Sequence, residues 1–361
     1  MTRDAVLEIL DLARWAPSGD NTQPWRFEIV GDDRVVVHGF DTRERCVYDL
    51  DGHSSQIALG AMLETLAIAA SAKGLSAHAR RRTGFADTEP TFDVTLVADP
   101  EATSSDLVPA IKLRSVQRRP LSTRPLADTE KARLAASVGP DFVLRWLEGW
   151  RARLRTTRTL VFNSKIRLTM PEAYQVHRDI IAWNADFSED KVPDRAVGLD
   201  PVTTMLMRWV MRDWRRVQFF NTFLAGTIVP RVQLDLIPGL ACAAHVLIVA
   251  PKEPSGIDDY VAAGRAVQRF WLTAALLGLQ HQPEVTPLIF SRYIREARSF
   301  SARTRTLIDA KRLRGEIGAL VGSDVADRAV WMGRIGAGKP ARARSLRLPL
   351  EKLIVSGTPS I

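Results

Sequence analysis

The chain has few of the residues that build cross-linked or metal-centred proteins. Among its 361 residues are two cysteines, Cys46 and Cys242, which are too few for a disulfide framework and lack the spacing of metal ligands. The six histidines are dispersed along the sequence, which argues against a zinc site. We therefore expect no metal and no disulfide scaffold.

The sequence also lacks a membrane-spanning run and a secretory signal. No apolar stretch reaches the length that crosses a bilayer, and the N-terminus reads Met-Thr-Arg-Asp-Ala-Val without a signal-peptide pattern. These absences predict a cytoplasmic protein with no membrane partner. The net charge of +9 is scattered, with denser basic runs at Arg80–Arg82 and Arg114–Arg124. Local clusters of this kind favour phosphate sites over a nucleic-acid-binding face, so we expect a small-molecule substrate and no nucleic-acid partner.

A short polar turn near the N-terminus is the most informative segment that is present. A predicted amphipathic helix runs to Trp15, Pro17 cannot continue it, and a strand is predicted from Trp25. Hydroxyl and amide groups crowd this turn at Ser18, Asn21 and Gln23. Such a turn offers hydrogen-bond donors and acceptors to the edge of a flat heteroaromatic ligand.

Two apolar stretches suggest an internal duplication. The segments Ile57–Leu75 and Val261–Leu279 both predict buried helices, and both end in a Gly-Leu pair. Gly60 and Gly264 lie near the two helix starts, and every landmark recurs 204 residues later. Because glycine costs a helix about 1 kcal/mol relative to alanine, the paired glycines predict close helix approach in both copies.

The order of predicted elements indicates an α+β fold with antiparallel sheets flanked by helices. In the first part a helix precedes strands near residues 26–30 and 34–38, and a strand near 93–97 follows the repeat helix. In the second part a helix over 128–137 precedes strands near 244–250 and 329–335. Helices mixed with strands at hairpin spacing are typical of α+β proteins.

A basic segment opens the second part. Arg114 and Arg118 are four residues apart with Ser115 between them, and a guanidinium can hold two phosphate oxygens at once. The segment therefore predicts a phosphate clamp, with a solvated basic loop as the alternative.

These motifs together resemble the FMN-dependent nitroreductase family. The loop Pro17, Ser18, Asn21, Gln23, Pro24 and Trp25 is similar to the family's flavin-facing Pro-Ser-x-x-Asn-x-Gln-Pro-Trp. The basic segment is similar to the family's Arg-x-Ser-x-Arg/Lys, which implies that Arg114 holds the FMN phosphate and Arg118 lies near the flavin pyrimidine. Its hydroxyl departs from the pattern, because Val116 stands where the family has Ser or Thr and Ser115 is one place early.

The resemblance implies further cofactor contacts. Near the C-terminus, Arg347 matches the family's Arg that completes the phosphate grip, with Ser345 or Arg344 before it. Val285 and Thr286 replace the Glu-Gly pair whose backbone passes the flavin N5, so this contact is the weaker match. His281, nearby, is a conceivable acid, although a lone histidine is more often structural.

The two parts have kept different pieces of this site. Residues 1–106 keep the flavin loop without a preceding phosphate segment, whereas residues 107–361 keep the phosphate segment without the loop and carry a helical insertion over about 150–235. In family homodimers each flavin contacts both subunits. The chain thus resembles a duplicated, single-chain branch: two tandem degenerate copies forming a pseudo-dimer around one FMN, either monomeric or further assembled as a homodimer.

A stripe of Met and aromatic residues crosses the insertion and has two interpretations. It is either ordinary core or a lid over the flavin. Its members are Met205, Met207, Trp209, Met211, Trp214, Phe219, Phe220 and Phe223.

The resemblance predicts an FMN oxidoreductase that transfers hydride through flavin N5 to or from a small molecule, with NAD(P)H as a possible electron donor. Two alternatives stay open: an FMN-sequestering protein with little turnover, and a biosynthetic dehydrogenase like the azoline oxidases. No protein catalytic residue is identifiable from the sequence.

Overall fold

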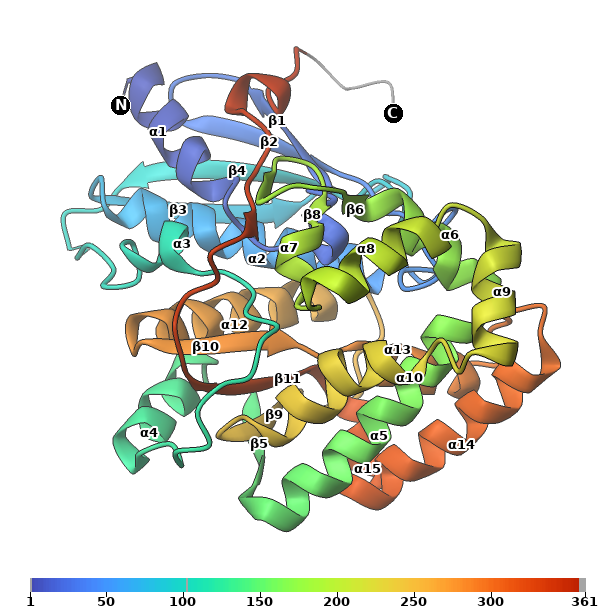
Figure 1. The fold of residues 1–361 in the computed structure, drawn as a ribbon. Coiled ribbons are helices and arrows are strands. Elements are labelled where there is room, and N and C mark those ends of the chain that lie inside the picture. The colour runs from blue at the N-terminus through green and yellow to red at the C-terminus, as the bar shows by residue number, and fades with distance from the viewer. Residues whose placement is uncertain (1, 102, 357–361) are drawn as a thin grey trace.

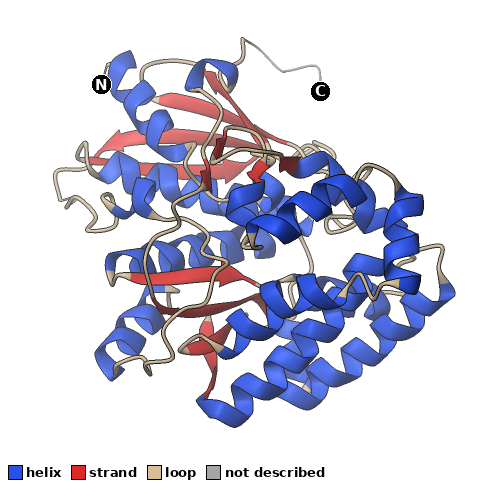
Figure 2. Cartoon of the chain, in the orientation of Figure 1, coloured by secondary structure: helices blue, strands red, loops and turns tan. Residues whose placement is uncertain are grey.

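The computed structural model describes residues 2–101 and 103–356. Within these ranges the chain builds two four-stranded antiparallel sheets, each packed against helices, with a helical region at one side (Figures 1 and 2). Two short two-stranded parallel pairs complete the strands: β6 (Ile181–Ala182) with β8 (Val192–Pro193), and β7 (Phe187–Ser188) with β12 (Arg344–Ser345). The α+β prediction is confirmed.

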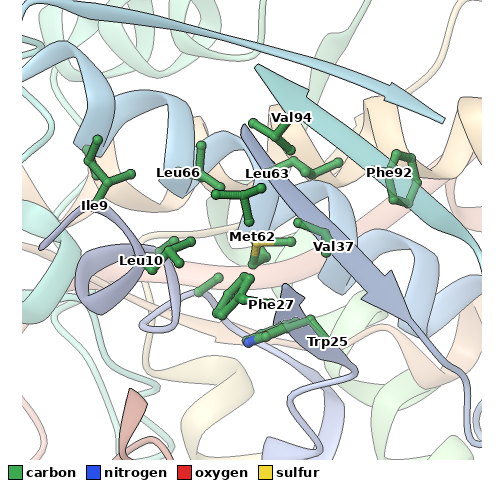
Figure 3. Close-up of a cluster of buried hydrophobic side chains, with 14 of the residues drawn as sticks. Ile9, Leu10, Trp25, Phe27, Val37, Met62, Leu63, Leu66, Phe92 and Val94 are labelled. Atoms are coloured by element: carbon green, nitrogen blue, oxygen red, sulfur yellow. The ribbon is translucent and has the colours of Figure 1, made fainter. Parts of the chain in front are cut away.

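The first sheet has the strand order β1-β2-β4-β3, and helices α1 and α2 pack on it. Their bounds are α1 Arg3–Ala13, β1 Trp25–Ile29, β2 Arg34–Gly39, α2 His53–Ser71, β3 Leu75–Arg81 and β4 Thr91–Ala98. Alternate residues of β1, Trp25 and Phe27, are fully buried against Leu10 and Met62 of the helices (Figure 3). Burial of these apolar side chains is the main force that holds the layer together.

The second sheet has the order β10-β11-β9-β5. Its elements are α4 Asp128–Ser137, β5 Val143–Glu148, β9 Ala244–Val249, α12 Ile257–Leu276, β10 Leu279–Pro283 and β11 Ala329–Ala337. Both sheets thus follow the sequence helix, strand, strand, helix, strand, strand. In space β5, β9, β11 and β10 occupy the positions that β1, β2, β4 and β3 occupy in the first sheet.

Helices α2 and α12 make the most extensive helix–helix contact and join the two sheet layers (Figure 1). A Cβ on Gly60 would lie 2.0 Å from the carbonyl oxygen of Val261, and a Cβ on Gly264 would lie 2.0 Å from that of Ile57. The close approach predicted from the paired glycines is confirmed. The contact is reciprocal: each glycine faces the turn of the partner helix that precedes the other glycine.

The helix ends differ from the sequence prediction. α2 ends at Ser71 and α12 at Leu276, a few residues before the Gly-Leu pairs that the sequence predicts as helix C-caps, each followed by a packing leucine. Gly74 and Gly278 adopt left-handed φ values of +68° and +70°, which release the chain from the helix. The leucine after each glycine then begins a strand, β3 or β10, that the sequence pattern did not reveal.

Helices fill the connection between β5 and β9. They are α5 Gly149–Thr169, α6 Pro171–Ile180, α7 Asp194–Val197, α8 Pro201–Val210, α9 Trp214–Phe223, α10 Ile228–Arg231, a π-helical turn at Val232–Leu236, and α11 Ile237–Leu240. Between β10 and β11 lie α13 Thr286–Arg295, α14 Thr304–Val321 and α15 Ser323–Arg328. α5 packs along α14, and a separate apolar core forms beneath them. The short elements η1 (Gly19–Asn21), α3 (Ala110–Leu113) and η3 (Leu350–Lys352) lie in connecting segments.

The C-terminal arm crosses from the second sheet back to the first (Figure 1, dark red). The backbone N–H of Phe27 donates to the carbonyl of Leu353 at 2.8 Å, and Val355 N–H donates to Phe27 at 2.9 Å. Leu353 is fully buried in the core of the first sheet. Residues 344–355 therefore belong structurally to both layers.

Across the part of the chain that the structure describes, no helix combines the length and the apolar character needed to cross a bilayer.

Candidate functional site

One cavity, of about 650 Å³, lies between the two layers and the inserted helices. It brings together segments that are far apart in the sequence: the turn after α1, the segment after α3, the start of α13 and the C-terminal arm. The predicted site residues on its wall are Pro17, Ser18, Asn21, Arg114, Ser115, Arg118, Val285, Thr286, Ser345 and Arg347. Gln23 is the predicted residue that does not line it.

The turn after α1 is held in an unusual backbone conformation. Asp20, Asn21 and Gln23 have φ values of +51°, +63° and +49°, in the left-handed region that residues other than glycine seldom adopt. The Gln23 backbone N–H donates to Ser18 Oγ at 2.9 Å, which closes the turn. Three left-handed residues in four positions are costly, and such strain persists only where the surroundings fix it.

The amides of this turn tie three segments together. Gln23 is fully buried; its Nε2 donates to the carbonyl of Glu189 at 2.9 Å, and its Oε1 accepts from Leu348 N–H at 2.8 Å. Asn21 Nδ2 donates to the same Glu189 carbonyl at 2.9 Å, and Asn21 Oδ1 accepts from Arg347 at 2.9 Å. These two side chains therefore position the wall by joining the turn to the insertion and to the C-terminal arm.

Three arginines meet at the end of α1 without any acidic partner among the described residues. Arg347 Nε donates to the carbonyl of Ala16 at 2.8 Å, Arg114 donates to that of Trp15 at 3.1 Å, and Arg344 donates to that of Arg114 at 3.1 Å. Arg114 and Arg347 are buried, and the Nε atoms of Arg114 and Arg344 have no hydrogen-bond partner. We call these three residues the arginine cluster.

The cluster carries more positive charge than its surroundings balance. Burial, together with Arg347 and Arg344, lowers the pKa of Arg114 well below its ordinary value. Burial and the neighbouring arginines Arg344 and Arg14 lower the pKa of Arg347 to about 9. Buried cations of one sign are costly without an anion. This part of the cavity wall therefore holds buried positive charge that no acidic group among the described residues balances.

The segment that carries Arg114 lies beside the second sheet. Val116 forms a parallel bridge with His281 of β10, and Gln117 N–H donates to the His281 carbonyl at 3.2 Å. The Arg114 guanidinium lies 4.6 Å from the ring centre of Trp271, a cation–π contact that fixes its direction. Arg118, further along, donates to the carbonyl of Ala196 at 3.1 Å.

Val285 and Thr286 line the cavity at the first turn of α13. Asn163 of α5 donates to Thr286 Oγ1 at 2.8 Å, which ties this turn to the insertion. Immediately before it, the buried Glu284 accepts from Arg334 at 2.7 Å and contacts His245 Nδ1 at 2.7 Å. Burial disfavours a charged imidazole, but Glu284 and Cys242 outweigh it and raise the pKa of His245 to about 10.

Several polar residues of the cavity carry no sequence motif and were missed. Tyr48 Oη and His177 Nε2 lie 2.9 Å apart, and Arg167 lies over the Tyr48 ring. Burial and Arg167 lower the pKa of His177 to about 3, so the ring is neutral near pH 7. Burial raises the pKa of Asp235 to about 6. Only the tertiary structure joins these residues, since they come from the loop before α2 and from the insertion.

His281 does not line the cavity. It is buried among Phe270, Trp271 and Trp331, and its Nε2 accepts from Trp331 Nε1 at 3.1 Å. Burial lowers its pKa to about 3. Its surroundings suit a packed neutral ring.

The Met and aromatic stripe divides between two surfaces. Met207, Met211 and Phe220 line the cavity, whereas Met205, Trp209, Phe219 and Phe223 are exposed to solvent. α8 has no buried residue at all. On α9, Val217 is buried and Trp214 packs against the buried Tyr174 at 5.2 Å between ring centroids. Of the two interpretations left open by the sequence, an ordinary core therefore does not fit α8, whereas α9 has core contacts on one side.

No group of three or more His, Cys, Asp or Glu side chains within residues 2–101 and 103–356 is arranged to hold a metal ion.

The chain is similar to known proteins over parts of its length. Residues 1–54 match the sequence model of the Nitroreductase family. Over 153 residues the chain is 29% identical to "Putative NAD(P)H nitroreductase acg" of Mycobacterium tuberculosis, strains CDC 1551 / Oshkosh and ATCC 25618 / H37Rv. That match covers 40% of this chain and 44% of the relatives, so it spans less than half of their length.

A solved structure of a nitroreductase-like family protein from Bacillus cereus aligns with 71% of this chain and 98% of its own, at 14% identity and a TM-score of 0.35. The family match covers the strained turn after α1. Residues 1–54 are therefore similar in sequence to the Nitroreductase family, and this similarity includes the turn after α1.

Proposed function

We propose that the chain binds one FMN in this cavity and works as a flavin-dependent oxidoreductase. The observation that carries the proposal is the arginine cluster, whose buried, unbalanced positive charge faces the same cavity as the nitroreductase-like turn. A phosphate dianion supplies the missing negative charge and can accept hydrogen bonds from several guanidinium groups at once.

The residues present fit this cofactor. Arg114, Arg344 and Arg347 would hold the phosphate, and the unpartnered Nε atoms of Arg114 and Arg344 are donors available to it. The turn at residues 17–21 and the first turn of α13 would border the ring system. Arg118 lines the cavity apart from the cluster and is a cation that could balance negative charge on a reduced ring. When bound, FMN supplies the hydride-transfer chemistry.

The duplication is part of this proposal. It is supported by the equal order of helices and strands in residues 1–106 and 107–361, and by the reciprocal contact of Gly60 and Gly264. In this interpretation the helices between β5 and β9, which contain the insertion predicted at about 150–235, were added to the second copy. A composite site then takes its turn from one copy and its arginine segment from the other.

A comparison of FMN with riboflavin tests the site directly. Riboflavin lacks the phosphate, so losing charge-assisted hydrogen bonds worth about 2–3 kcal/mol should weaken its binding by about 30- to 150-fold. Fluorescence titration of the flavin-free protein measures both affinities. Equal affinities, or no binding of either flavin, would contradict the proposal.

Anaerobic mixing with NADH or NADPH separates turnover from storage. α8 and α9 help to enclose the cavity, an arrangement that also suits an FMN-sequestering protein. Bleaching of bound flavin followed by steady oxidation of the nicotinamide supports the reductase. A flavin that stays oxidised favours storage or, if a peptide or metabolite bleaches it instead, an azoline-oxidase-like dehydrogenase.

A further inference from the structure

The outer surface of the inserted helices is apolar although it faces solvent. On α8, the residues Val202, Met205, Leu206 and Trp209 are exposed, with Met205 at 71%. Their spacing of three, four and seven positions places them in one stripe along the helix. Phe219 and Phe223, four residues apart on α9, are also exposed, Phe223 at 72%.

These side chains form one continuous surface. The Trp209 ring contacts Phe220 at 6.0 Å between centroids, Phe220 contacts Phe219 at 6.2 Å, and Phe219 contacts Phe223 at 5.2 Å. Leu224, Ile228 and Val229, which follow α9 in the chain, are also exposed. We call these exposed residues the outer face. Contiguous apolar surfaces of this kind on a globular protein mark sites of interaction.

The outer face borders the mouth of the cavity. Val202, Leu206, Leu224 and Val229 are exposed and also line the cavity, so they form part of its rim. Whatever covers the outer face therefore lies next to the entrance of the candidate site.

The charges around the outer face are mostly positive. Residues 200–231 contain five arginines and two acidic residues, Asp213 and the α8 N-cap Asp200. Arg212, in the connection between the two helices, and Arg215, in the first turn of α9, are exposed. Arg216 lies over the Trp209 ring at 4.3 Å. Helices that lie in a membrane interface have this composition: apolar and aromatic side chains flanked by basic residues.

We propose that the outer face docks on an anionic phospholipid surface. The apolar stripe enters the boundary between headgroups and acyl chains, and the arginines pair with lipid phosphates. A second copy of this chain is a poorer partner, because a two-fold interface would set the arginines of one face against those of the other. Docking on a membrane surface needs no membrane-spanning helix. It therefore differs from the membrane span whose absence the sequence predicts.

Vesicle flotation with the full chain tests this proposal. Binding is expected to vesicles of phosphatidylcholine mixed with phosphatidylglycerol, to weaken as salt is raised, and to be about tenfold or more weaker with phosphatidylcholine alone. The double variants Phe219→Ser with Phe223→Ser, and Arg212→Glu with Arg215→Glu, should lose it.

Matched controls change the same chemistry elsewhere. Trp150→Ser with Ile308→Ser removes two exposed apolar residues outside the outer face, and Arg80→Glu with Arg151→Glu reverses two exposed charges. Both controls should bind vesicles like the wild type. Equal loss in variants and controls, or no vesicle binding by the wild type, overturns the proposal.

Two further measurements distinguish membrane docking from self-association and from a change in the flavin site. Sedimentation velocity without lipid tests for self-association. If the wild type forms a dimer that the Phe219 and Phe223 variant abolishes, and if it does not bind vesicles, the outer face is a self-association surface instead. The FMN affinity of each variant should be unchanged, since none of the substituted residues lines the cavity. Failure of FMN binding alone would leave vesicle binding intact, so the two proposals fail independently.

Discussion

At the scale of single residues, the arginine cluster shows a conflict between stability and binding. Arg114 is 3% exposed, lies near two further arginines and has no acidic partner among the described residues. If the proposed function is right, its charge destabilises the fold without flavin and becomes favourable when the phosphate binds. Residues with this property are expected at binding sites more than in ordinary cores.

Arg114→Met should therefore separate the two effects. Met keeps apolar contact with Trp271 but removes the buried charge, so the free energy of unfolding without flavin should stay the same or rise by about 1 kcal/mol. FMN affinity should fall by about 30- to 150-fold. Denaturant unfolding and flavin titration measure the two quantities.

Arg119→Met is the control, because Arg119 is exposed and does not line the cavity. It should leave both quantities near wild type. If the two variants lost FMN equally, the segment would be a diffuse basic loop.

His245 predicts a loss of stability at alkaline pH. Its folded-state pKa of about 10 is above the ordinary 6.5, so its ion pair with Glu284 stabilises the fold fully below about pH 6.5. The contribution is lost as the pH rises through about 10. The free energy of unfolding, measured by denaturant between pH 7 and 10, should fall.

His245→Gln should flatten that part of the profile and cost about 3–5 kcal/mol at pH 7, because Glu284 then loses a buried charged partner. An unchanged slope in the variant would assign the alkaline loss to other groups.

At the scale of elements, the contact of α2 with α12 depends on two glycines. An added methyl at Gly60 or Gly264 meets a backbone carbonyl at 2.0 Å, which a side-chain rotation cannot relieve. One helix must move, and with it a whole sheet layer and the cavity between the layers.

Gly60→Ala and Gly264→Ala should each lower the free energy of unfolding by about 3 kcal/mol or more. Gly315→Ala is the matched control, since Gly315 lies inside α14 with nothing within 4 Å of the added Cβ. The free energy of unfolding of that variant should rise by about 0.5–1 kcal/mol. Thermal and denaturant unfolding measure the stability of the contact variants and of the control. If Gly60→Ala and Gly264→Ala lose little stability, the helices can move apart at little cost.

At the scale of the whole molecule, the two sheet layers share an order of elements but not a set of site residues. The first layer contributes the turn at residues 17–23. In the second, the connection between α4 and β5 is Val138–Phe142, which has no Ser, Asn or Gln. The turn that lines the cavity therefore comes from the first layer, and the second layer has no equivalent turn.

We predict one FMN per chain. Reconstitution, gel filtration and release of the flavin by denaturation give the ratio of flavin absorbance to protein, and light scattering gives the mass of the complex. Two flavins per chain would contradict the composite site, and one flavin shared by two chains would place the site between copies.

The sequence by itself predicted the features that local patterns encode. Apolar periodicity and breaker residues identified α1, β1, β2, β4, β9 and β11, and the paired glycines predicted close helix contact. The motif spacing predicted that the turn at 17–23 and the segment at 114–118 carry the site. The helices and strands depend on neighbours along the chain, so periodicity reveals them, whereas the helix contact follows from the repeated glycines and the flavin site from the resemblance to the nitroreductase motifs.

The tertiary structure alone decided which of these segments meet. β3, β5 and β10 carry weak local patterns, and they exist because partner strands offer hydrogen bonds across long stretches of sequence. Gln23 and Asn21 carry polar amides, yet their partners at Glu189, Arg347 and Leu348 are more than 160 residues away. The charge balance of a buried arginine likewise depends on every group packed around it. Long-range contacts are not encoded in any local window, and for that reason the polar wall of the cavity emerged only with the fold.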